Sequence, residues 1–146
     1  MTPKDLSART ILARLTLMRE LLDDLDMVGT PSAGDLQDDR LRRRALERIL
    51  TQLVDLASDI NQHAASTLSG DLASDYRETF DAAARLGMIP TSLAEKLKPS
   101  VGMRNALVHE YVTIDLDLVA SAVPVARDQY GSYVRHVAQW LSEPRP

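Results

Sequence analysis

Apolar residues recur every three or four positions along most of the chain, which is the period of an amphipathic helix. The first such stripe predicts a helix over 5–26, and segment 28–34, which contains glycine and proline, ends it. Asp35 is suited to cap a second and longer helix, whose apolar stripe ends near Leu68. The members of that stripe are Leu46, Ile49, Leu50, Leu53, Leu56, Ala57, Ile60 and Ala64.

The next part of the chain predicts a short helix and the start of another helix. The short helix is expected over 74–86, with Tyr76 and Phe80 facing inward. Ser92 and Glu95 have the spacing of a capping box, in which each side chain accepts a backbone hydrogen bond from the other residue. This spacing predicts that a fourth helix begins at Ser92.

Two prolines lie inside predicted helices. Proline lacks a backbone donor and clashes with the preceding turn, so Pro99 predicts a kink or a short break. A separate helix is then expected over 100–110. Asp115 or Asp117 can cap a last helix, which Pro124 bends or splits in two.

Composition agrees with a helical fold and limits the class of protein. Of 146 residues, 45% are hydrophobic but only 4% aromatic, and glycine is scarce, which favours helix over sheet. No segment alternates convincingly enough to predict a strand. We therefore expect one all-α domain over 1–146, an antiparallel up-and-down bundle of four long helices and one shorter helix.

The absence of cysteine excludes disulfides, thiolate nucleophiles and zinc sites with sulfur ligands, and it fits a reducing cytoplasm. There is no apolar run of signal-peptide or membrane-spanning length, so a cytoplasmic protein without membrane contact is expected. The net charge of −4 argues against a general nucleic-acid coat, whose affinity comes from neutralising many phosphates. Any RNA site must therefore be a local basic cleft.

The segment from Arg104 to Tyr111, Arg-Asn-Ala-Leu-Val-His-Glu-Tyr, carries the candidate chemistry. At about 100° per residue, Leu97, Val108 and Tyr111 fall within roughly 40° of Arg104, whereas His109 lies about 140° away. Arg104 therefore belongs to an apolar stripe. A buried arginine needs hydrogen-bond partners or must line a cleft that binds an anion, because an unpaired buried charge is costly.

These residue types suit the cleavage of RNA. The reaction needs a base for the ribose 2′-OH, an acid for the leaving 5′-oxygen, and positive charge beside the phosphate oxygens. Histidine exchanges protons near neutral pH, and the arginine fork can bind two phosphate oxygens without any metal. Asn105 is placed to orient the imidazole or a phosphate.

Each of these residues also has a structural interpretation. Arg104 is equally compatible with a structural arginine that a helix carbonyl or an acidic neighbour satisfies. His109 near a helix end can cap carbonyls, and Tyr111 can be a core residue whose hydroxyl bonds Arg104. Asn105 can be an ordinary surface asparagine.

Other polar residues favour structural roles. The arginines between Arg40 and Arg48 are read as a solvated, salt-bridged face, with an RNA-contacting rim as the second interpretation. His63 follows Asp59 by four residues, but the sequence has no Glu-x-x-His pattern, so we expect a surface or interface histidine and no metal site. His136 has no partner pattern.

The spacing of Arg104, His109 and Tyr111 resembles the motif of the HEPN ribonucleases, specifically the HepT toxins. Further segments that resemble this family are 43–48, 76–80 and 114–115. The likeness extends over roughly the whole chain in its order of helices. The string from Arg104 to Tyr111 is much more specific than an arginine and a histidine alone.

The resemblance implies a HEPN-like homodimer in which two motif helices face each other across a cleft. It implies a toxin of a toxin–antitoxin system, a metal-independent endoribonuclease without cofactor that cleaves tRNA or mRNA. Arg104 and His109 would be catalytic, and Asn105 and Glu110 would support them. Tyr111 matches the tyrosine to which a minimal nucleotidyltransferase antitoxin, MntA, transfers AMP from ATP.

Two other classes of protein are open on the sequence. One is a catalytically silent HEPN-type binding or scaffold subunit of a two-component nucleotidyltransferase, in which Tyr111 is only a regulatory acceptor. The other is a generic helical dimer without chemistry. The need for His109 in RNA cleavage separates the ribonuclease from both.

Overall fold

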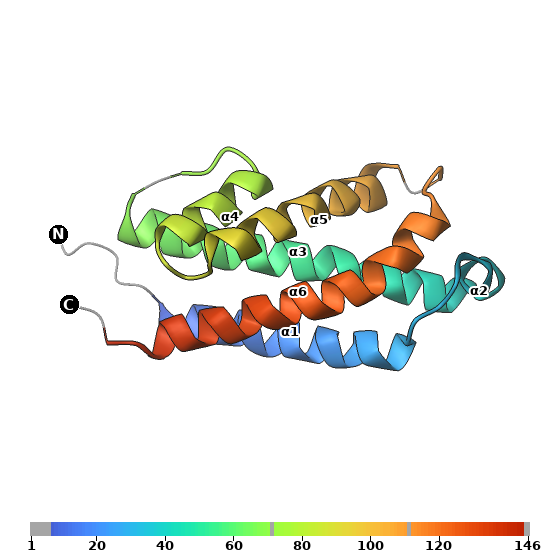
Figure 1. Ribbon diagram of the computed structural model, residues 1–146, viewed down its shortest axis with the longest axis horizontal. Helices are drawn as coiled ribbons and strands as arrows, with labels where there is room; N and C mark the ends of the chain where they lie inside the picture. Colours follow the sequence, from blue (N-terminus) through green and yellow to red (C-terminus); the bar gives the residue numbers. More distant parts are fainter. Residues whose placement is uncertain (1–6, 71, 111, 145–146) are drawn as a thin grey trace.

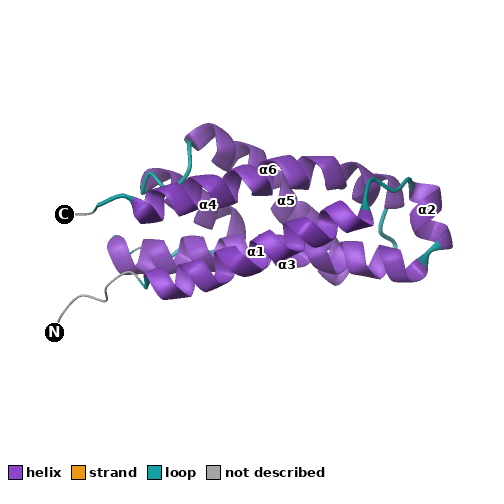
Figure 2. Cartoon of the chain, turned by 90° about the horizontal axis from the view of Figure 1, so that it is seen from below, coloured by secondary structure: helices purple, strands orange, loops and turns teal. Residues whose placement is uncertain are grey.

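The computed structural model describes residues 7–70, 72–110 and 112–144, and its regular structure over these residues is entirely helical (Figure 2). In chain order the helices are α1 (Ala8–Val28), α2 (Ala33–Asp38), α3 (Arg40–Leu68), α4 (Tyr76–Arg85), α5 (Thr91–His109) and α6 (Leu116–Ser142). The predicted all-α fold is confirmed. None of these helices is long and apolar enough to cross a membrane.

The four long helices α1, α3, α5 and α6 run alternately in opposite directions along the bundle, with α4 beside α3 and α5 (Figure 1). Helix α3 is central, because it contacts every other helix. Its apolar stripe is buried along nearly its whole length, as the residue pattern predicts. The expected bundle of four long helices and one shorter helix is therefore present, with α2 as an addition.

The prediction for residues 28–38 was wrong in two respects. Ser32, inside the segment expected to be a loop, caps α2, and its hydroxyl accepts the backbone N–H of Asp35. The Asp35 carboxylate accepts the backbone N–H of Ser32 in return, so Asp35 completes a capping box and does not cap the long helix. Asp39 caps α3. The side chain of Leu36 is fully buried and anchors the short α2 to the bundle.

The predicted capping box and the predicted break in α5 were also wrong, although the helix begins within one residue of Ser92. Pro90 is the N-cap of α5 and the cap has no side-chain hydrogen bond, so Ser92 and Glu95 do not form a capping box. Helix α5 continues unbroken through Pro99. Buried Leu97 and Val101 lie on either side of the proline and anchor both halves of the helix, which offsets the one missing backbone hydrogen bond.

Helix α6 is likewise continuous through Pro124, although its first turns are set at an angle to the rest (Figure 1). Asp115 caps it by accepting the backbone N–H of Asp117. The predicted bend in this helix is therefore present, and the alternative, a helix split in two at Pro124, is not. Trp140 near its end is buried.

A buried polar link joins α3, α4 and α6 in the core. The Tyr133 hydroxyl donates to Asn61 Oδ1 at 2.6 Å, and Asn61 Nδ2 donates to the Thr79 hydroxyl at 3.5 Å. Burial raises the pKa of Tyr133 well above its usual value, so the phenol keeps the proton that it donates. The Phe80 ring meets Tyr133 edge-on at 6.3 Å between centroids. This link fixes α4 against α3, and α4 in turn positions one wall of the candidate site.

Candidate functional site

Arg104 lies on the side of α5 that faces α3 and is held by an acidic residue of that helix. Its Nε donates to Asp55 Oδ1 at 2.8 Å, and the Arg104 side chain is 20% exposed against 32% for Asp55. The apolar stripe thus correctly predicted a semi-buried arginine that needs a partner. Of the two partners considered for a structural arginine, the acidic neighbour is the one found.

The ring of Tyr76 supports the same guanidinium from α4. Arg104 Cζ lies 5.0 Å from the ring centroid, which is within the range of cation–π attraction. Burial raises the pKa of Tyr76, and the negative charge of Asp55 raises it further, while Arg104 partly offsets both. The phenol therefore stays neutral, and the guanidinium is oriented by a carboxylate and an aromatic ring together.

The two terminal nitrogens of Arg104, Nη1 and Nη2, decide whether its guanidinium can bind another group. Nη1 donates to the Asn105 side-chain oxygen at 3.3 Å, so this amide contacts the arginine and not an imidazole. Nη2 makes no hydrogen bond to any residue in 7–70, 72–110 or 112–144. A phosphate oxygen could accept from Nη2 without breaking the ion pair with Asp55.

His109 and Glu110 lie at the C-terminal end of α5, and both are exposed. No hydrogen bond or ion pair joins the His109 ring to another described side chain. At about 100° per residue His109 is about 140° around the helix from Arg104, so one chain does not direct both at a single point. Glu110 is the C-cap, and its N–H bonds the Ala106 carbonyl. Tyr111 lies outside the described residues.

Sequence reasoning missed Asp55, and the residue pattern gave no signal for it. At about 100° per residue, Asp55 and Asp59 lie roughly 160° and 120° from Leu53, away from the apolar stripe of α3, where carboxylates are ordinary. Burial raises the pKa of Asp59 and the charge of Asp55 adds to this, while Arg14 at 3.9 Å opposes it. A pairing with Arg104, 49 residues away, could not be read from the sequence.

The other histidines and the basic cluster take structural positions. His63 Nε2 accepts the backbone N–H of Ser7 at 3.1 Å and so ties α3 to the start of α1, which replaces the surface or interface position expected for it. His136 is half-buried near Trp140, in a hollow at the other end of α5 from the motif. No group of three or more His, Asp or Glu side chains in the described ranges is arranged to hold a metal ion.

Within the basic cluster, two arginines have intramolecular partners. Arg43 pairs with Glu47 at 2.9 Å, and Arg42 Nε donates to the Val28 carbonyl at 3.0 Å. Arg40, Arg44 and Arg48 are exposed. The solvated, salt-bridged interpretation therefore describes part of this face and leaves three outward cations.

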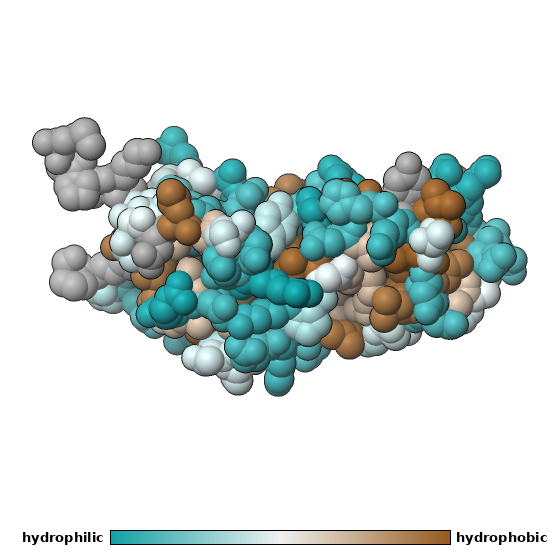
Figure 3. Space-filling model, turned by 90° about the horizontal axis from the view of Figure 1, so that it is seen from above, coloured by the Kyte–Doolittle hydropathy of each residue, from teal (hydrophilic) through white to brown (hydrophobic). Residues whose placement is uncertain are grey.

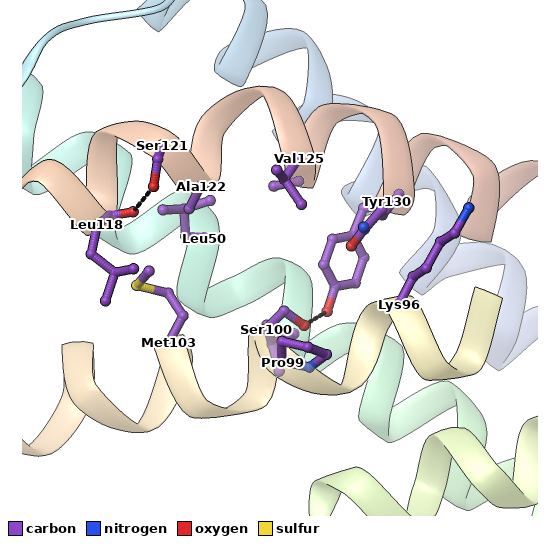
Figure 4. Close-up of a pocket in the computed structure, with 13 residues that line it drawn as sticks. Leu50, Lys96, Pro99, Ser100, Met103, Leu118, Ser121, Ala122, Val125 and Tyr130 are labelled. Carbon is purple, nitrogen blue, oxygen red and sulfur yellow. Dashed lines mark hydrogen bonds between the residues drawn. The ribbon is translucent and has the colours of Figure 1, made fainter. Parts of the chain in front are cut away.

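A groove between α5 and α6 runs beside the site (Figure 4). It encloses a cavity of about 210 Å³ with mainly apolar walls. Met103 and Leu118 approach each other near one end, and the hydroxyls of Ser100 and Tyr130 hydrogen-bond at 2.5 Å near the other. Leu118 and Val125 are each 50% exposed. Apolar side chains also gather on the surface where α5 ends and α6 begins (Figure 3).

Comparison with known proteins assigns the chain to a family. The model of the ribonuclease HepT-like family matches residues 17–137, which include all of α3, α4 and α5. The chain belongs to the ribonuclease HepT-like family. It is 34% identical over 128 residues to the tRNA nuclease HepT of Aphanizomenon flos-aquae, covering 88% of this chain and 87% of that protein.

A second HepT nuclease and a solved toxin structure are also similar to this chain. The chain is 27% identical over 89 residues to the mRNA nuclease HepT of Shewanella oneidensis, covering 61% of this chain and 64% of that one. Its fold matches the tri-AMPylated HEPN toxin of Shewanella oneidensis, solved in complex with an MNT antitoxin, with a TM-score of 0.81 at 19% identity. That match covers 91% of this chain and 99% of the toxin. The HEPN-like fold expected from the motif is thus confirmed.

Proposed function

We propose that this chain is the toxin of a toxin–antitoxin pair and acts as a metal-independent endoribonuclease on tRNA or mRNA in the cytoplasm. Its HepT-like relatives are nucleases for these two RNA classes. The observation that carries the proposal is Arg104, a semi-buried cation oriented by Asp55 and Tyr76 that keeps Nη2 for an outside acceptor.

The proposed reaction is attack by the ribose 2′-oxygen on the adjacent phosphorus. A base removes the 2′-OH proton as the new P–O bond forms, and the P–O5′ bond breaks as an acid gives the 5′-oxygen a proton. The products are a 2′,3′-cyclic phosphate and a free 5′-OH. His109 exchanges these protons, and Arg104 stabilises the charge on the phosphate oxygens.

A homodimer supplies both groups to one phosphate, since Arg104 and His109 diverge on a single helix. The exposed apolar side chains of the α5–α6 groove support this arrangement. Lys96 lines one end of the groove, and Asp117 is exposed at the start of α6 beyond the other end. A twofold axis across the groove would bring Lys96 of each copy towards Asp117 of the other.

Regulation is proposed to act on Tyr111, two residues beyond His109. A nucleotidyltransferase antitoxin of the MntA type would transfer AMP to its phenol, which fits the tri-AMPylated state of the Shewanella toxin. Each AMP adds negative charge to the motif segment and would repel an incoming RNA phosphate. A Tyr111→Phe protein should then remain a nuclease and escape modification.

Cleavage of bulk tRNA in excess EDTA tests this function. The purified protein, checked by intact mass to carry no AMP, is compared with His109→Ala. We expect cleavage with a 2′,3′-cyclic phosphate end that only the variant loses. If the unmodified protein leaves tRNA and mRNA intact, the chain is instead the silent scaffold subunit and the proposal fails.

A further inference from the structure

Arg77 in the first turn of α4 reaches across to α5 at Gly102. A methyl group at Gly102 would lie 3.2 Å from Nη2 of Arg77, which is closer than side chains normally pack. The guanidinium thus occupies the space that glycine leaves open on α5. Gly102 has an ordinary helical backbone, so this space, and not an unusual backbone conformation, is what its missing side chain provides.

Gly102 lies on the same face of α5 as the candidate catalytic histidine. At about 100° per residue, His109 is within about 20° of Gly102 and Asn105 within about 60°, whereas Arg104 is about 160° away. Seven residues of helix place His109 about 10 Å further along the axis. Arg77 therefore adds positive charge to the face of α5 that carries His109. Arg104 lies on a different face.

The charge of Arg77 is not neutralised by the groups around it. Its side chain is exposed and forms no ion pair with a described residue. Three carboxylates near it in the chain make other contacts. Asp75 and Glu78 accept backbone hydrogen bonds at the start of α4. Asp81, one helical turn beyond Arg77, pairs with Lys98. A cation that lies against the backbone of another helix and has no carboxylate partner among the described residues is available to an external anion.

Another contact between the same helices behaves differently. Lys98 of α5 bridges Asp81 of α4 at 2.5 Å and Glu95 at 2.8 Å. These two carboxylates neutralise the charge of Lys98, so this part of the α4–α5 contact offers no unpaired cation. At Gly102, one turn further along α5, the cation has no such partners among the described residues.

We propose that Arg77 is a second phosphate-binding residue, which contacts an RNA phosphate next to the one that is cleaved. The proposal rests on the ribonuclease function proposed above. Because Arg77 meets α5 at Gly102, about 10 Å along the helix axis from His109, it holds the strand in register and does not touch the reacting atoms. Its loss should therefore raise KM much more than it lowers kcat.

RNA binding measured without cleavage tests the contact directly. The His109→Ala protein serves as background, and Arg77→Gln is compared with Arg85→Gln, which removes an equally exposed arginine from the other end of α4. We expect about tenfold weaker binding of a short single-stranded RNA for Arg77→Gln at low salt, with a salt dependence smaller by about one charge. Arg85→Gln should bind as the background does.

Equal affinities for the two variants would overturn the proposal, as would RNA binding too weak to measure in the background protein. Light scattering controls for assembly, since a change of oligomeric state in Arg77→Gln would place Arg77 at a subunit contact instead. The outcome is independent of the cleavage test, because a protein that binds RNA through Arg77 and never cuts it would refute only the ribonuclease function.

Gly102→Ala provides a second test that separates binding from folding. Alanine favours helix over glycine, so the melting temperature should stay the same or rise. The added methyl group requires the Arg77 guanidinium to shift by a few tenths of an ångström, so RNA binding should weaken slightly. In the Arg77→Gln background Gly102→Ala should cause no further loss, and an additive loss would contradict the proposed contact.

Discussion

Two semi-buried arginines in this fold, Arg127 and Arg104, have nearly the same first description. Arg127 on α6 pairs with Asp26 at 2.6 Å, and its side chain is 33% exposed. Arg104 on α5 pairs with Asp55 at 2.8 Å and is 20% exposed. Burial and an ion pair therefore do not distinguish a structural arginine from a functional one.

The difference lies in what the remaining donors do. Arg127 Nη2 donates to the carbonyls of Leu25 and Gly29 at 3.3 and 3.5 Å, at the C-terminal end of α1. Arg104 donates to no backbone carbonyl among the described residues, and its guanidinium lies against the Tyr76 ring. Arg127 Nη2 therefore binds the end of a helix, whereas Arg104 Nη2 hydrogen-bonds no described residue. The two sites should respond oppositely to mutation.

The largest expected effect is the loss of activity in Arg104→Ala. Cleavage should fall about a thousandfold, the scale seen when a donor to a developing negative charge is removed. Stability should change little, because the abandoned Asp55 carboxylate is 32% exposed and water can solvate it. Product analysis and a thermal melt on the same sample check both parts. A cooperative unfolding transition lost together with activity would make Arg104 another structural arginine.

A smaller loss is expected when the orienting carboxylate is neutralised. Asp55→Asn keeps the shape of the side chain but weakens its hold on Arg104, so kcat should fall about tenfold with little change in KM. Asp55 also raises the pKa of Tyr76, so ultraviolet titration of the variant should show that phenol ionising at lower pH, a change that Tyr76→Phe abolishes. Faster cleavage by Asp55→Asn would mean that the ion pair restrains Arg104.

Periodicity in the sequence was sufficient to predict the bundle. The apolar stripes of α1, α3 and α6 each contain buried residues at several successive turns. A misread residue therefore does not change the number of helices predicted there. The failures lie where one or two residues decide the structure. The capping box predicted at Ser92 is not formed, whereas Ser32, in a segment predicted as a loop, forms one and begins α2, which buries Leu36.

The site was predictable only as far as it is local in the chain. Arg104, Asn105 and His109 stand out within one helix, and their angular separation follows from their spacing. The partners of Arg104 come from α3 and α4, and no periodicity links those segments to α5. Tyr76 was expected to face inward, but its role as a platform for Arg104 depends on how α4 packs.

Removing Arg127 should produce the opposite result to removing Arg104. Arg127→Gln loses the ion pair with Asp26 and the bonds to the end of α1, so the free energy of unfolding should fall by about 1–2 kcal/mol. Cleavage per folded molecule should not change at temperatures well below the melting point. Denaturant unfolding and an active-fraction assay measure the two quantities. A specific loss of cleavage in the folded variant would remove the distinction between the two arginines.

The smallest expected effect concerns Asp59, one turn beyond Asp55 on α3, whose ion pair with Arg14 is long at 3.9 Å. Burial raises the pKa of Asp59, so the folded state binds the proton more tightly than the unfolded state does. The ionised side chain therefore destabilises the fold above the raised pKa, and this penalty declines as pH falls through it and disappears below the ordinary value of 3.8.

Asp59→Asn should accordingly melt slightly above the parent protein at pH 7, by about one degree at most, because the Asp59 side chain is 56% exposed and water screens most of the penalty. The difference should narrow towards pH 4. Asp35→Asn is the matched control of opposite sign, because hydrogen bonds from Ser32 lower the pKa of Asp35 and its ionised form stabilises α2. If Asp59→Asn melts below the parent at pH 7, the Arg14 pair outweighs burial. Asp59 would then be a second firmly paired carboxylate on α3, like Asp55.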